Sequence, residues 1–129
     1  MLATSALVTQ LQTTLGTSWV VSESASASEV NATTLDVILG PVRVLGEYSD
    51  EYTFEFILRP GDNFLESEAR TLVTQLDTVL RDLAETAVGG LQIIAVTSGY
   101  LSRYAPEATK ENPQYRGSYT YEVEGSLVL

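Results

Sequence analysis

Paired carboxylates are the residues of this sequence whose spacing comes nearest to a catalytic arrangement. The dense pairs are Asp50 with Glu51, Glu66 with Glu68, and Glu122 with Glu124. On a strand, Glu122 and Glu124 would share one face about 7 Å apart, which a two-carboxylate hydrolase could use. Polar strand faces of acidic proteins produce such pairs routinely, so we interpret them as solvated surface. We therefore expect the protein not to be an enzyme.

Two residue types on which many catalytic and metal sites depend are missing. The chain contains no His and no Cys, so it lacks the commonest general base and the thiolate ligands of zinc. Asp50–Glu51 and Asp62–Asn63 are oxygen-rich turns without the spacing of an EF-hand loop. Gly89–Gly90 precedes a predicted strand and no Lys follows, unlike a phosphate-binding loop. We therefore expect no metal and no cofactor.

Tyrosines and cationic residues gather toward the C-terminus. Five of the 7 tyrosines and three of the 7 Lys and Arg residues lie at or after position 100. Tyr and Arg are enriched at protein interfaces. The candidate interface residues are Tyr100, Arg103, Tyr104, Lys110 and Arg116, together with Arg59. We expect Tyr119 and Tyr121 to be core residues instead.

The charge of the chain excludes several classes of partner. Among 129 residues, 17 are acidic and 7 basic, which gives a net charge of -10. Such a polyanion is poorly suited to phosphate contacts with nucleic acid or to an anionic membrane. Arg43 is the first basic residue, so we expect no secretory signal, and no apolar run approaches the ~18 residues of a membrane span.

Two amphipathic helices are predicted to support these residues. Within residues 2–15, apolar residues recur every four positions, and Gly16 marks the end. The second helix is predicted from about Asn63 to Val88, between a capping pattern and Gly89–Gly90. Its continuous apolar stripe consists of Leu65, Ala69, Leu72, Leu76, Val79, Leu80, Leu83 and Ala87.

The clearest predicted strand covers Glu51–Arg59, where aromatic and apolar residues alternate with polar ones. Further strands are predicted at 19–21, 35–44, 91–97 and 119–128, and irregular segments at 22–28 and 98–114. Pro41 lacks an amide donor, so we expect an edge, a bulge or a bend there. The pattern predicts one α+β domain over residues 1–129, with a single, mostly antiparallel sheet and two helices packed on one face.

In element order, the chain resembles the tail terminator proteins of long-tailed bacteriophages, also called tail completion or minor tail proteins. The stretches that carry the resemblance are EYTFEFILRPGDNFLESEARTLVTQLDTVL and the closing QYRGSYTYEVEGSLVL. The shared order is an N-terminal helix, a strand pair, a long helix after a Pro-Gly turn, and a long final strand.

The resemblance implies a structural role without catalysis. It implies a homo-oligomeric ring, usually a hexamer, that caps the tail tube protein, ends tube growth and joins the tail to the head–tail connector protein. DNA would pass through the lumen without specific binding, and no membrane would be involved. The protein would belong to the virion tail or neck, and to the host cytoplasm during assembly. Two alternatives stay open: another head–tail joining protein, and an acidic protein that mimics nucleic acid.

Overall fold

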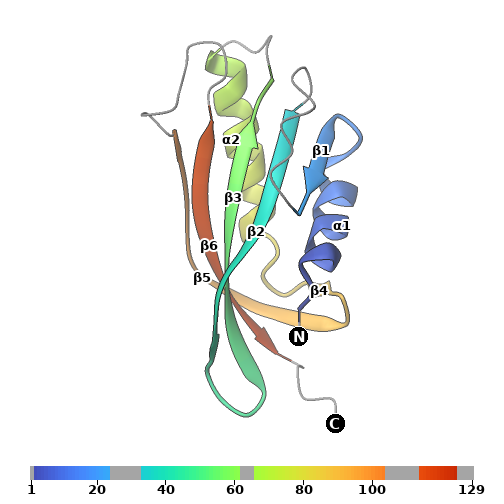
Figure 1. Cartoon of the computed structure of the whole chain (residues 1–129), viewed down its shortest axis with the longest axis vertical. Coiled ribbons are helices and arrows are strands. Elements are labelled where there is room, and N and C mark those ends of the chain that lie inside the picture. The colour runs from blue at the N-terminus through green and yellow to red at the C-terminus, as the bar shows by residue number, and fades with distance from the viewer. Residues whose placement is uncertain (1, 24–32, 62–65, 104–113, 125–129) are drawn as a thin grey trace.

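In the part of the chain that the structure describes, six strands form a single sheet, and two helices accompany it (Figure 1). The structure, a computed structural model, describes residues 2–23, 33–61, 66–103 and 114–124. The elements are α1 (Thr4–Leu15), β1 (Trp19–Ser22), β2 (Thr33–Val44), β3 (Ser49–Arg59), α2 (Glu66–Arg81), β4 (Ala87–Val88), β5 (Leu91–Arg103) and β6 (Tyr115–Glu124). The predicted α+β class with one sheet is confirmed.

The strands lie in the order β1-β2-β3-β6-β5-β4. β1 pairs with β2 in parallel, and every other pairing in the described sheet is antiparallel. The sheet is therefore mixed, and the expectation of a mostly antiparallel sheet is confirmed in part. In Figure 1, β5 curves from the upper left to the foot of α1, where it meets β4.

The core is one cluster of buried side chains that come from the strands and from both helices. The alternation predicted for β3 is confirmed, because Tyr52, Phe54, Phe56 and Leu58 are all buried. Leucines of both helices join these residues in one cluster, which also contains Tyr119 and Tyr121 as expected. The buried leucines of the helices are Leu7, Leu11 and Leu15 of α1 and Leu76 and Leu80 of α2. In Figure 1, α2 lies behind the central strands and α1 lies beside β1.

A bulge interrupts β2 at the position predicted from Pro41. The register passes from Leu39 opposite Phe54 to Val42 opposite Tyr52, which leaves Gly40 and Pro41 without partners in the ladder. A Cβ on Gly40 would lie 2.9 Å from the carbonyl oxygen of Thr53, so a side chain does not fit there. Beyond the bulge, β2 and β3 continue as a hairpin to the lower end of the molecule (Figure 1).

The second helix is shorter than its apolar stripe indicates. α2 ends at Arg81, whereas helix was expected up to Val88. Glu85 has a φ of 67°, a left-handed conformation that ends helical geometry. Its amide donates to the carbonyl of Ile93 at 2.7 Å, and Ile93 donates back to Thr86 at 2.8 Å, so β-type pairing replaces helix at this point.

Two further boundaries differ from the sequence prediction. β5 continues to Arg103, although residues from 98 onward were expected to be irregular. Register shifts at Ile93/Ala95 and Val96/Ser98 break the two-residue period that identifies a strand. β6 begins at Tyr115, four residues earlier than predicted. Residues 24–28 of the predicted serine-rich loop and 125–128 of the predicted last strand lie outside the described residues.

Candidate functional site

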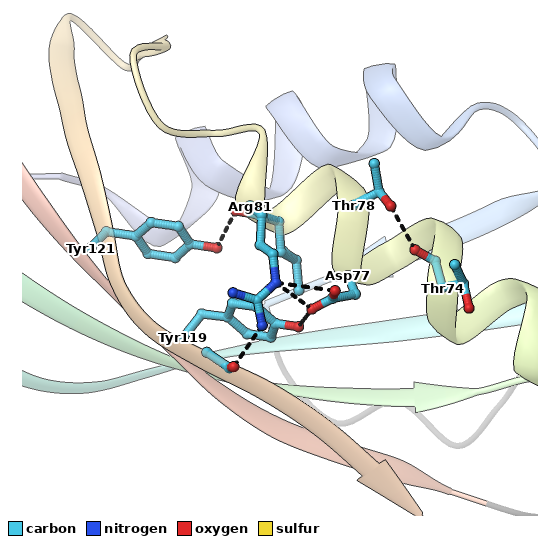
Figure 2. A network of polar contacts seen from close by, with 8 residues as sticks. Thr74, Asp77, Thr78, Arg81, Tyr119 and Tyr121 are labelled. Atoms are coloured by element: carbon cyan, nitrogen blue, oxygen red, sulfur yellow. Dashed lines mark hydrogen bonds and ion pairs between the residues drawn. The ribbon is translucent and has the colours of Figure 1, made fainter.

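A network of polar contacts joins the end of α2 to β5 and β6 (Figure 2). The Arg81 Nε donates to both carboxylate oxygens of Asp77, at 3.0 and 3.1 Å, so the i,i+4 pair is formed. Another guanidinium nitrogen of Arg81 donates to the carbonyl of Gly99 at 2.8 Å. The Tyr119 hydroxyl donates to the same carboxylate of Asp77. Asp77 thus accepts from its own helix and from the sheet.

Tyrosine side chains of β6 complete this connection. The Arg81 guanidinium lies 5.7 Å from the centroid of the Tyr119 ring, within cation–π range. The Tyr121 hydroxyl donates to the backbone carbonyl of Leu80 at 2.9 Å. This bond satisfies one of the carbonyls that the end of a helix leaves without a partner. The phenols of β6 therefore hold the last turn of α2 on the sheet.

The electrostatics of the cluster favour hydrogen bonding over catalysis. Burial, followed by the hydrogen bond to Asp77, raises the pKa of Tyr119 well above its ordinary value. Burial also raises the pKa of Tyr121. The hydrogen bond and charge of Asp77 raise the pKa of Arg81. Both phenols therefore stay protonated donors, and neither is prepared to act as a base at neutral pH.

A shallow cavity of about 330 Å³ adjoins the cluster, between α2 and β5. Its lining residues are Val73, Thr74, Asp77, Arg81, Gly99, Tyr100 and Leu101. The charged groups of this lining, Asp77 and Arg81, already neutralise each other. We therefore interpret the cluster as a structural junction and not as an active site.

The outward face of the sheet carries most of the charged strand residues. Arg43, Glu51, Glu122 and Ala95 form one row across four strands, since consecutive members are register partners. Arg43 contacts Glu51 at 3.2 Å. Glu122 stands directly opposite Glu51 on the next strand, and like charges in that position are destabilising.

A second ion pair lies near the other end of this face. Asp36 is fully buried, and Arg59 donates to its carboxylate. Ser22 donates to the other oxygen of Asp36 at 3.1 Å, which links β1, β2 and β3. An unpaired buried carboxylate would be costly, so Arg59 has a structural role at this position.

The structure describes some of the sequence-predicted interface residues and not others. Arg59, Arg116 and Tyr100 lie on the adjacent strands β3, β6 and β5, on the outward face near the same end. Tyr100 is 60% exposed, and Arg116 is half-buried. Arg103 ends β5, but its side chain lies outside the described residues. Tyr104 and Lys110 also lie outside them.

The sequence analysis did not single out the exposed apolar surface of the β2–β3 hairpin. Its members are Leu39, Val42, Val44, Leu45 and Tyr48. Val44 is 74% exposed and Tyr48 is 62% exposed. The signal was the acid-free run VILGPVRVLG, which was interpreted only as a strand that continues beyond Pro41.

Neither a metal centre nor a membrane helix emerges from residues 2–23, 33–61, 66–103 and 114–124. No group of three or more Asp and Glu side chains in these ranges could hold a metal ion. No helix in them is long and apolar enough to cross a bilayer. The chain matches no protein-family model, and a search of curated proteins found no match.

Proposed function

We propose that this chain is a structural protein of a long-tailed bacteriophage. Copies of it would form a ring, of six by the resemblance, that caps the tail tube, ends its polymerisation and joins the tail to the head connector. The observation that carries the proposal is the order of the elements. An N-terminal helix, a strand pair, a long amphipathic helix after Pro60–Gly61 and a long final strand are the elements shared with tail terminators. We also propose that both helices cover the same face of the sheet.

The charge distribution supports a passive role toward DNA. Glu51, Glu55 and Glu122 lie on the outward face of β3 and β6, and the net charge is -10. DNA-binding surfaces need Lys or Arg at the phosphates, whereas a lumen of like charge lets the duplex pass without adhesion. The sheet face that the helices leave free is suited to such a surface.

Tail tubes provide the direct test of this function. Purified tubes would be mixed with the protein, and their ends examined by negative-stain electron microscopy. We expect a ring at one end of each tube and an arrest of further polymerisation of free tube protein. Tubes that keep growing at an unchanged rate, with no added density at their ends, would contradict the proposal.

The acidic outward face also supports a second candidate, a protein that mimics nucleic acid. The adjacent carboxylates of Glu51 and Glu122 could be recognised by a basic protein in place of phosphates. Binding to an immobilised DNA-binding protein separates the two candidates. A mimic should bind as a single copy and lose affinity in Glu122→Gln, whereas a ring-former should not bind.

A further inference from the structure

We propose that copies of this chain join edge to edge, with the unpaired part of β2 in one copy adding to the unpaired part of β5 in a second copy. The inference rests on the proposed function insofar as that function requires self-association. It goes further in naming the surface through which one copy contacts the next.

Both edges of the described sheet contain a long stretch without a strand neighbour. β1 pairs only with residues 33–36 of β2, so Val37–Val44 has no strand partner on that side within the described part of the chain. β4 pairs with Leu91 and Gln92, and Ile93 bonds to the backbone of Glu85 and Thr86, so the unpaired outer side of β5 begins at residue 94 among the residues that the structure describes. The strand order places β2 and β5 on opposite sides of the central pair β3 and β6. One copy therefore presents complementary unpaired backbone on its two flanks.

The two unpaired stretches lie at the same level of the sheet. Following the register across β3 and β6, Val37 aligns with Leu101, and Val42 aligns with Val96. A copy placed beside another without an axial offset would therefore bring the stretches opposite each other. β2 and β5 run in opposite directions, since three antiparallel pairings separate them. The new pair would be antiparallel, and such a head-to-tail contact closes into a ring when the rotation allows.

Charge identifies a second copy as the occupant of these edges. None of the 17 acidic residues lies within 37–44 or 94–101, so the junction avoids the repulsion that the rest of the surface would impose. In the outward row, Arg43 of one copy would lie beside Ala95 of the second copy and two strand spacings, about 10 Å, from its Glu122. Glu122 stands opposite the like charge of Glu51 within its own chain. In the junction it would also lie near the guanidinium of Arg43 from the other copy.

The exposed apolar residues lie on this same edge. Leu39 is 40% exposed, Val42 is 37% exposed and Val44 is 74% exposed, although all belong to β2. A strand added along β2 would bury them. The carbonyl of Gly99 on β5 already accepts a hydrogen bond from Arg81. The added strand would therefore pair with the other backbone N–H and C=O groups along that edge of β5.

Two matched glutamate variants test the junction. Val42→Glu places a charge on the unpaired edge of β2, and Val20→Glu places the same charge on β1, where the valine is 39% exposed. Mass would be measured by light scattering at about 1 M NaCl, where charges are screened beyond ~3 Å. We expect wild type and Val20→Glu to form multimers and Val42→Glu to stay a single chain with an unchanged melting temperature. Multimers of Val42→Glu equal to those of wild type would overturn the inference.

Engineered disulfides test the pairing itself, since the chain contains no Cys. Cross-strand neighbours lie within disulfide range, so oxidised Val42→Cys/Val96→Cys should give a ladder of covalent multimers. Each single variant should give none. Covalent dimers from Val42→Cys alone would indicate β2 against β2 and overturn the inference. If the double variant forms rings but no crosslink, the edge-to-edge inference is overturned and the proposed function is not affected. If the protein never assembles, even on tail tubes, the proposed function is contradicted.

Discussion

At Gly99, the missing side chain leaves room for the ring of Tyr119. A Cβ at this position would lie 2.2 Å from a ring carbon of Tyr119, which is closer than any side chain permits. The ring would have to move, and its hydroxyl would then leave Asp77. The polar cluster therefore depends on a residue that contributes only a backbone carbonyl to it.

Gly99→Ala should accordingly destabilise the fold by about 1–3 kcal/mol, the usual cost of overpacking. Gly46→Ala is the matched control, because a Cβ there meets nothing within 4 Å. Urea denaturation followed by tyrosine fluorescence would measure both free energies of unfolding. Equal values for the two variants would show that Tyr119 is not held as described.

The two buried phenols predict a loss of stability in alkaline solution. The unfolded chain releases each phenolic proton near pH ~10, whereas the raised pKa values of Tyr119 and Tyr121 retain it in the folded chain. Above pH ~10 the folded state therefore binds more protons, and the free energy of unfolding falls as the pH rises. The decline should be shallower in Tyr119→Phe and in Tyr121→Phe, as measured by denaturation between neutral and alkaline pH. An unchanged slope in both variants would refute this.

Local sequence spacing accounts for one half of the polar cluster. Asp77 and Arg81 are four residues apart on a helix, and that spacing alone predicts their pair. The contact of Asp77 with Tyr119 joins residues 42 positions apart, so no local pattern contains it. The same holds for Asp36 with Arg59, where the strand register brings the charges together.

Among the elements, α2 depends on its apolar stripe. Leu76 is completely buried at the centre of that stripe. Leu76→Ala should cost about 2–5 kcal/mol, as large-to-small changes in cores do. Gln75→Ala, on the exposed side of the same turn, should stay within about 0.5 kcal/mol of wild type in the same thermal or urea unfolding measurement. An unfolding midpoint unchanged by Leu76→Ala would contradict the packing.

Element type was predictable where periodicity was unbroken, as in Glu51–Arg59 and in the centre of α2. The prediction of element type failed where the backbone geometry did not follow the side-chain pattern. Ala87 continues the helical stripe, yet Glu85 in a left-handed conformation turns the chain into β4. The bulges of β5 concealed the second half of that strand, from residue 98 onward, for a similar reason, because each of them shifts the alternation by one residue.

Over the whole molecule, charge opposes assembly and salt should promote it. Every copy brings a net charge of -10 to a ring. Screening shortens the Debye length from ~10 Å at 0.1 M to ~3 Å at 1 M salt, so repulsion between copies falls while apolar contacts are retained. Sedimentation velocity across this range should show the multimer fraction rising with salt. A multimer fraction that falls with salt would indicate attraction between charged groups as the main force.

The mass of the native particle tests the central claim most directly. Native mass spectrometry of the wild-type chain, prepared at high salt over a wide range of concentration, would count the copies in each particle. The account predicts one discrete closed species, six copies of the 14.0 kDa chain by the resemblance, with no larger open series. A particle of a single 14.0 kDa chain at every concentration would contradict it.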